Sequence, residues 1–112
     1  MRQFRDLGVL IVASGNIVHN LRTMRRDAPA DQAYDWAIEF DREIADRIGR
    51  GDADGLADFQ ALGEPARLAQ PSDEHYLPLL YAAGAAAPGE PVRFFNERFQ
   101  AMSISMRSAI WD

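Results

Sequence analysis

The chain has 112 residues, of which 47% are hydrophobic and 26% are charged, and its formal net charge is −5. This length and composition predict one globular domain over residues 1–112. The negative balance argues against nucleic acid as a partner, because few cations remain to neutralise phosphates. No apolar run reaches the length of a bilayer span, so we expect no membrane partner. Cysteine is absent and no signal peptide is visible, which together favour a cytoplasmic protein.

The first strong pattern is the apolar run Gly8–Ala13. Short, continuous runs of aliphatic residues are typical of strands buried on both faces of a parallel sheet. The run leads into Ser14, Gly15 and Asn16, and then into His19, which is one of only two histidines. We therefore expect a strand whose carboxyl end carries a functional site, with glycine allowing a sharp turn or a close approach.

A long helix is predicted from an N-cap at Asp31 to about Ile48. Three- and four-residue steps place an apolar stripe on one side, formed by Ala37, Phe40, Ile44 and Ile48. We expect Asp41 to point outward. The remaining charged side chains predict a solvated face of mixed charge, made by Asp35, Glu39, Arg42, Glu43, Asp46 and Arg47. Glycines at 49 and 51 predict the end of the helix.

Shorter elements are predicted after this helix. A short helix is expected over residues 53–62, and Pro65 can open a further helical piece. Another helix is expected from a cap at Ser72 or Asp73 to about Ala83, with Pro78 in its first turn. Val92–Phe95 and the period-two pattern over residues 102–111 predict two late strands joined near residues 96–101. The order of a strand, helices and two strands indicates an α/β fold.

The residue types leave two interpretations of each histidine open. His19 suits general acid–base work, because its pKa lies near neutrality. It could equally be structural, held in a turn by Asn16 or Asn20. His75 follows Asp73 and Glu74 and could be an oriented metal ligand or an ordinary polar residue. A catalytic metal usually needs three protein ligands, so two histidines do not predict a complete metal site within one copy of the chain.

Three stretches resemble one family, the class III extradiol ring-cleavage dioxygenases of the LigB type, in their 4,5-DOPA dioxygenase branch. Residues 8–22 resemble that family's strand and histidine turn. Residues 74–85, which contain Glu74-His75-Tyr76-Leu77-Pro78-Leu79-Leu80, are similar to its second histidine segment. Residues 102–108 are similar to its final strand. The order and separation of these stretches fit the family over almost the whole chain.

This resemblance implies a metal-dependent enzyme that opens a catechol ring with dioxygen. It implies that His19 is the acid–base residue, close enough to the metal to contact it, and that His75 is a metal ligand. Iron(II) is the metal that the family implies, and zinc(II) is the alternative, since histidine binds both. Ser14, Asn16, Asn20 and Glu74 are then expected to bind substrate or to support the two histidines.

Members of this family are more than twice as long, and their other metal-binding histidines come from an N-terminal half. We therefore expect this chain to correspond to the C-terminal part of a LigB-type catalytic subunit, with its sheet flanked by helices. It would be a fragment, a truncated gene product or half of a split enzyme. The strand at Gly8 would have exposed edges, so we expect either a homo-oligomer or a separate N-terminal half as partner.

Two functions follow from these patterns. The first is an extradiol dioxygenase of the LigB type whose chain is incomplete for catalysis by itself, and whose aromatic substrate stays open. The alternative is a non-catalytic module derived from that fold, which binds a metal or a partner.

Overall fold

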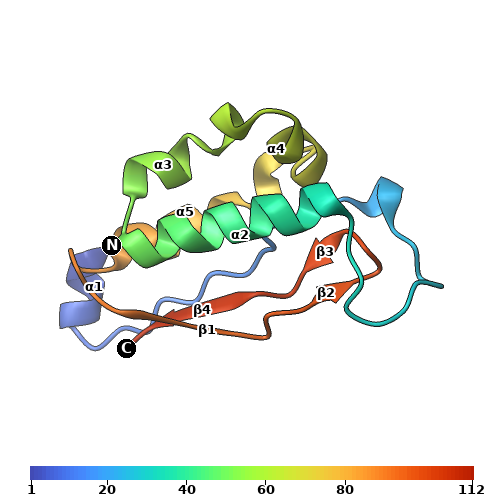
Figure 1. Ribbon diagram of the computed structural model, residues 1–112. Helices are drawn as coiled ribbons and strands as arrows, with labels where there is room; N and C mark the ends of the chain where they lie inside the picture. The colour runs from blue at the N-terminus through green and yellow to red at the C-terminus, as the bar shows by residue number, and fades with distance from the viewer.

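A computed structural model describes residues 1–112 of the protein. The helix α2 crosses the middle of the molecule, with α3 and α4 on one side and the strands on the other, and both termini lie at the same end (Figure 1). No helix is long and apolar enough to cross a membrane. The elements in chain order are α1 (Arg2–Asp6), the 3₁₀ helix η1 (Leu21–Thr23), α2 (Asp35–Arg50), α3 (Ala53–Ala57), η2 (Phe59–Leu62), α4 (Glu64–Ala69), η3 (Asp73–His75), α5 (Leu77–Ala85), β1 (Val92–Phe95), β2 (Phe99–Gln100), β3 (Ile104–Ser105) and β4 (Ser108–Trp111).

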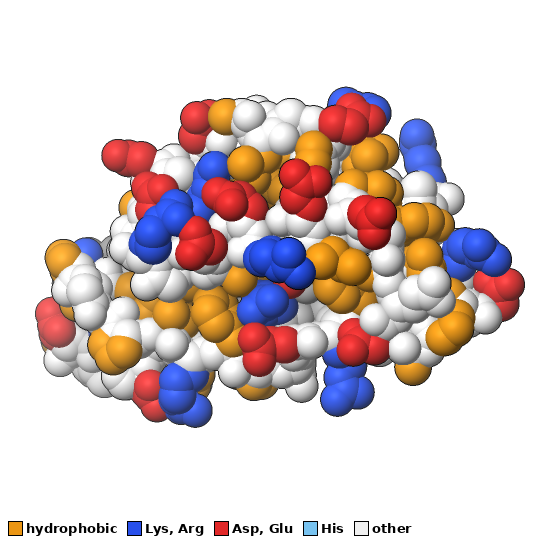
Figure 2. Space-filling view, viewed as in Figure 1, with side chains coloured by type: hydrophobic (Ala, Val, Ile, Leu, Met, Phe, Trp, Pro, Cys, Tyr) orange, Lys and Arg blue, Asp and Glu red, His pale blue; other side chains and the backbone are white.

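The apolar stripe predicted for the long helix is confirmed in α2. Its four members, Ala37, Phe40, Ile44 and Ile48, are all buried. The helix ends at Gly51, whose φ of 68° is left-handed and suits glycine. Acidic and basic side chains are interspersed over the exposed side of the helices (Figure 2), as the mixed-charge pattern predicts. The amphipathic pattern therefore identified both faces of this helix.

The start of α2 differs from the prediction. Tyr34, not Asp31, is the N-cap residue, and its side chain makes no capping hydrogen bond. Asp31 has a φ of 64° and accepts a hydrogen bond from the backbone N–H of Phe99 at 2.9 Å. The carboxylate is therefore used to hold β2 and not to cap the helix.

The prediction for Asp41 is wrong, because this residue is only 4% exposed. Its carboxylate accepts a hydrogen bond from Ser105 Oγ at 2.6 Å and forms an ion pair with Arg107 Nη2 at 2.8 Å. Asp41 lies four positions after Ala37 and three before Ile44, so it belongs to the same helical stripe. The stripe that faces the core thus includes a charge that ties α2 to β3 and the turn before β4.

The strand predicted over Gly8–Ala13 is not formed. These residues have no β-pairing, and Leu10 and Val12 are 83% and 78% exposed. A short strand needs neighbours to satisfy its backbone groups, and residues 10–15 make no backbone hydrogen bond in this chain. The apolar run is therefore an unpaired extended segment.

The prediction of late strands is confirmed in part, in a fold that mixes helix and strand. Four short strands form two antiparallel pairs where two strands were expected, and β2 lies in the predicted connection over residues 96–101. β1 pairs with β4 from Val92↔Trp111 to Phe95↔Ser108, and β2 pairs with β3 between them. The single period-two pattern over residues 102–111 is broken at residues 106–107, which separate β3 from β4.

The remaining helices keep the predicted order with different limits. The helix predicted over residues 53–62 is divided at Asp58 into α3 and η2, and α4 has Pro65 in its first turn. The helix predicted from residue 72 or 73 is η3 followed by α5, and Pro78 lies in the first turn of α5 as predicted.

Three aromatic side chains form the centre of the core. The rings of Phe59 and Tyr76 have centroids 4.0 Å apart, and Phe40 packs against both. The Tyr76 hydroxyl donates to the carbonyl oxygen of Leu56 at 2.7 Å, so its one polar atom is satisfied. Burial raises the pKa of this hydroxyl. The core thus joins α2, η2 and the residue that follows His75.

The buried ion pair gives the first prediction. Replacing Asp41 with alanine leaves Arg107 without its buried partner, so we expect the free energy of unfolding to fall by about 3 kcal/mol. Arg50, paired with Asp46 on the exposed surface, is the control, and its replacement with alanine should cost less than about 1 kcal/mol. Urea denaturation measures both changes. Equal losses in the two variants would contradict the structural role of Asp41.

Candidate active site

The two histidines, far apart in the sequence, lie against each other. The ring centroids of His19 and His75 are 3.6 Å apart and the ring planes differ by 21°, so the imidazoles are stacked. Both side chains are partly exposed. The two histidine stretches, which are separate in the sequence, thus meet in one site at the molecular surface.

His19 is positioned by backbone hydrogen bonds on both sides of its chain segment. Its N–H donates to the carbonyl oxygen of Ala69 at 2.9 Å, and an isolated antiparallel bridge pairs it with Ile104. The preceding residue, Val18, is fully buried and accepts from the N–H of Ser105 at 3.0 Å. An extended segment alternates its side chains, so burial of Val18 leaves His19 on the opposite side.

His75 is positioned by the core residue next to it and by the first histidine stretch. Tyr76 is fully buried, which fixes the chain immediately after His75. The N–H of Asn16 donates to the carbonyl oxygen of His75 at 2.8 Å. A Cβ at Gly15 would lie 2.2 Å from that same oxygen. Only glycine therefore lets the two stretches approach this closely.

Gln70 is a supporting residue that the sequence analysis missed. Its Nε2 donates to the carbonyl oxygens of Asn16 and Ile17 at 2.9 and 2.6 Å, and its side chain is buried. Its Oε1 is also buried and has no hydrogen-bond partner. The available signal was a single amide between Ala69 and Pro71, which does not reveal a contact with residues so far back in the chain.

The other predicted site residues lie in different surroundings. The side chain of Asn16 donates to the carbonyl oxygen of Ser105 at 2.9 Å. Asn20 is buried, donates to Leu68 and caps η1, so its amide serves the fold. Glu74 Oε1 lies 3.7 Å from His75 Nε2. Ser14 is exposed and makes no hydrogen bond.

The surroundings of His19 favour its neutral form. Partial desolvation, and then the neighbouring His75, lower the pKa of His19 from its ordinary value. A neutral imidazole can accept a proton or bind a metal ion through a ring nitrogen. The pair therefore presents an uncharged histidine ready for either task near neutral pH.

The two imidazoles are ligands of the type that a transition metal prefers, but there are too few of them for a complete metal site. Imidazole nitrogen is a common ligand for both iron(II) and zinc(II). No group of three or more ligating side chains is placed to hold a metal ion in this chain. Because lone pairs lie in the ring planes, stacked rings must also turn before both can bind one ion. This chain alone therefore supplies two donors of an incomplete set.

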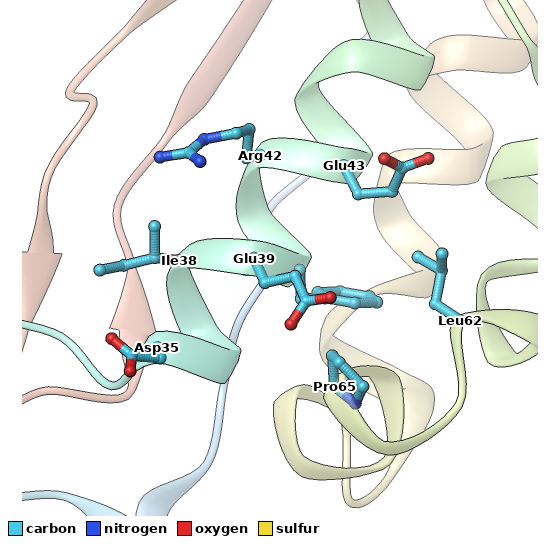
Figure 3. Close-up of a pocket in the computed structure, with 8 residues that line it drawn as sticks. Asp35, Ile38, Glu39, Arg42, Glu43, Leu62 and Pro65 are labelled. Carbon is cyan, nitrogen blue, oxygen red and sulfur yellow. The ribbon is translucent and has the colours of Figure 1, made fainter.

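A hollow also lies along α2. It has a volume of about 400 Å³ and is bordered by α2, Leu62 and Pro65. Figure 3 shows Asp35 and Arg42 on one side of the helix and Glu39 and Glu43 closer to Leu62 and Pro65. Its charged groups do not converge on one point. The hollow contains neither histidine, so the stacked pair is the better candidate site.

Comparisons with known proteins give matches that run over nearly the whole chain. Residues 1–109 match the family model described as "Catalytic LigB subunit of aromatic ring-opening dioxygenase". The 4,5-DOPA dioxygenase extradiol of Escherichia coli (strain K12) is 39% identical over 106 residues, and that of Mirabilis jalapa is 30% identical over 99 residues. These matches cover 93% and 87% of this chain but only 39% and 36% of the relatives.

A solved structure is also similar. The crystal structure of an uncharacterized protein from Escherichia coli K12 has a TM-score of 0.85 and 36% sequence identity, and the match covers 96% of this chain and 45% of that chain. The chain thus spans less than half the length of these proteins, and it keeps the arrangement in space of the solved structure.

The lowered pKa of His19 gives a prediction for titration. Because the folded state favours the neutral ring, we expect NMR titration to show His19 below its ordinary value of 6.5. The unfolded chain then binds a proton at a higher pH than the folded chain does. The contribution of His19 to the free energy of unfolding should therefore be complete above about pH 6.5 and should be lost as the pH falls below it. Replacing His75 with glutamine should raise the pKa of His19 part of the way. A His19 pKa at or above 6.5 would contradict this account.

The close approach at Gly15 gives a prediction for stability. Replacing Gly15 with alanine forces its Cβ against the His75 carbonyl oxygen, so we expect a loss of about 1–3 kcal/mol in the free energy of unfolding. Gly84 in α5 is the matched control, because a Cβ there meets nothing within 4 Å. Its replacement with alanine should be neutral or stabilise the helix by up to about 1 kcal/mol. Thermal unfolding followed by circular dichroism distinguishes the two outcomes.

Proposed function

Because the chain belongs to the LigB family, the catalytic subunits of aromatic ring-opening dioxygenases, we propose that it serves an extradiol dioxygenase that opens a catechol-type ring with dioxygen. The observation that carries this proposal is the stacked pair of His19 and His75. It lies within a match that runs over nearly the whole chain. The names of the relatives support a dihydroxyphenyl compound as the substrate class.

We assign the acid–base role to His19. A catechol hydroxyl must lose a proton before the ring can react with dioxygen, and a neutral imidazole can accept it. Desolvation and the adjacent His75 lower the pKa of His19, so a captured proton is held weakly and is available for return to the product. The backbone bonds that fix residues 18–20 keep the ring in place during both transfers.

We assign His75 to the metal site, with His19 near enough to contact the same ion. Iron(II) is the metal that we propose, with zinc(II) as the alternative. When bound, the metal supplies a Lewis acid that acidifies the catechol and brings dioxygen beside it. Glu74, close to His75 Nε2, orients that ring. Asn16 supports the site by holding the carbonyl group of His75.

We propose that the chain is incomplete for catalysis by itself. It offers two imidazoles where a metal site of this kind needs more donors, and it spans 39% of the Escherichia coli relative. The remaining groups would come from the part of the fold that the chain does not span, or from a second protomer. A cytoplasmic location and the absence of nucleic-acid and membrane partners complete the proposal.

A non-catalytic module is the alternative, and the shortage of metal ligands is the observation that favours it. Metal analysis of the protein purified from cells separates the two functions. Stoichiometric metal that is lost on replacing His75 with alanine supports a working site. If no preparation of the protein contains metal, the non-catalytic module is supported.

A chimera tests the proposed function. The matching part of the Escherichia coli 4,5-DOPA dioxygenase extradiol would be replaced by this chain, and its ring-opened yellow product would be followed with iron(II), substrate and air. We expect an active enzyme, and replacement of His19 with glutamine should lower its rate by about 10²–10⁴-fold. Replacing His75 with glutamine should remove bound metal as well as activity.

The control for the chimera is the exposed Arg26, whose replacement with glutamine should leave the rate unchanged. A folded chimera that retains full activity without His19 would refute the assigned acid–base role. A folded chimera with no activity at all would refute the proposed function of the chain.

A further inference from the structure

The chain bends directly before His19, and the side chain of Gln70 holds this bend. Residues 17 and 18 form the bend, between the extended segment before them and the bridge at His19. Gln70 Nε2 donates to the carbonyl oxygens of Asn16 and Ile17 at 2.9 and 2.6 Å. In a fully extended chain successive carbonyl groups point in opposite directions, so two of them reach one nitrogen only where the chain turns. The amide of Gln70 is therefore matched to the bend.

All the hydrogen bonding of the Gln70 side chain goes to this bend. Its Nε2 carries two N–H donors, which suits two carbonyl acceptors. Its Oε1 has no partner in the protein, and the residue is only 7% exposed. The two acceptors also fix the orientation of the amide, because the amide oxygen cannot take the place of the nitrogen there. A change at Gln70 therefore acts on the bend first.

The bend is linked to both histidines through the backbone. The N–H of Asn16 donates to the carbonyl oxygen of His75 at 2.8 Å. The N–H of His19 donates at 2.9 Å to the carbonyl oxygen of Ala69, the residue before Gln70. The amide of Gln70 thus lies between the backbone bonds that hold the two histidines.

We propose that Gln70 is a positioning residue, whose amide sets the separation and the angle of the two imidazole rings for the reaction. The ring centroids of His19 and His75 are 3.6 Å apart, and the ring planes differ by 21°. Both rings are partly exposed, so their surroundings do not enclose them and the backbone beneath must define the arrangement. Without the two donors of Gln70 the bend relaxes, and the mount of His19 shifts relative to His75.

This inference rests on the proposed function only in its statement about the reaction. The geometry of the histidine pair belongs to this chain and is measured without metal or substrate. The effect on the rate depends on the proposed chemistry and needs the chimera. The two parts of the inference therefore have separate tests.

NMR spectroscopy of this chain tests the geometry. Stacked rings shift each other's ring-proton resonances, so the imidazole protons of His19 and His75 report on the stack. Gln70→Met keeps the length of the side chain and removes both donors. At about pH 8.5, where both imidazoles are neutral, we expect these resonances to move toward their positions in the urea-unfolded chain. The Tm should fall by about 5–10 °C, because two buried carbonyl groups lose a partner.

Control variants separate positioning from stability. Glu90→Ala removes the ion pair with Arg5 beyond the far end of α5, so the Tm should fall by about 4–8 °C while the imidazole resonances stay in place. Gln60→Met makes the same replacement at an exposed glutamine of η2 and should change neither quantity. Gln70→Asn keeps the amide on a shorter side chain and should give an intermediate shift. It decides the matter if Gln70→Met does not fold.

The chimera with the Escherichia coli 4,5-DOPA dioxygenase extradiol tests the consequence for the reaction. Gln70 is buried and acts through the backbone, so Gln70→Met should leave KM nearly unchanged. Misplacement of the two rings should lower kcat by about 10–10²-fold. Gln70→Asn should restore part of this loss, and Gln60→Met should leave kcat as it is.

Three outcomes would overturn the inference. The first is a folded Gln70→Met or Gln70→Asn variant whose imidazole resonances equal those of the original chain. The second is an equal shift of these resonances in Glu90→Ala, which would make the effect one of stability alone. The third is an active chimera that keeps its full kcat with Gln70→Met. A chimera that is inactive with the original sequence would instead refute the proposed function, and the NMR result would still decide the geometry.

Discussion

The fold and the candidate site depend on how one extended segment, residues 16–20, is held. On one side it bonds to residues 103–105, and on the other to Ala69, Gln70 and His75. Next to the site, this segment is hydrogen-bonded both to the late strands and to the short helices, and it thereby connects them. Its buried members, Ile17 and Val18, join the same core as Tyr76. The position of His19 is therefore a consequence of core packing, not of a separate binding loop.

The same constraint explains why a stacked contact can persist at a partly exposed site. Each histidine is adjacent to a fully buried residue, Val18 in one case and Tyr76 in the other. Moving the backbone that carries either ring would require the neighbouring core residue to shift, and close packing resists such shifts, while each ring can still turn about its own side-chain bonds. Rigid mounting of this kind is what a proton-transfer or metal-binding group requires.

Features that depend on local pattern were predictable from the sequence. The stripe of α2, its end at Gly51 and the position of Pro78 each follow from spacing within one element, and the structure confirms them. The meeting of His19 with His75 came from the family resemblance, because spacing alone contains no information on contacts between distant segments. The strand predicted over Gly8–Ala13 was wrong because its composition suits a strand, but strand formation also depends on neighbouring segments, which a local pattern does not reveal.

Side chains that work across the core were the least predictable. The binary pattern placed Asp41 outside, since a carboxylate is seldom buried. Its actual role depends on Ser105 and Arg107, which lie more than sixty residues later in the chain. Gln70 escaped notice for the same reason, because its partners at Asn16 and Ile17 are distant in sequence. An amide or a carboxylate acquires its role only when the partner is known.

The ion pair between Asp41 and Arg107 also limits how this family can diverge. The two charges pair with each other where both side chains have little access to water. Losing either one leaves the second largely buried with a weaker partner, which is the Ser105 hydroxyl for Asp41 and the exposed Glu97 for Arg107. Neutral drift at one position is therefore blocked unless the other changes with it. Among homologous sequences, positions 41 and 107 should vary together, as an acid with a base or as two uncharged residues of matching volume.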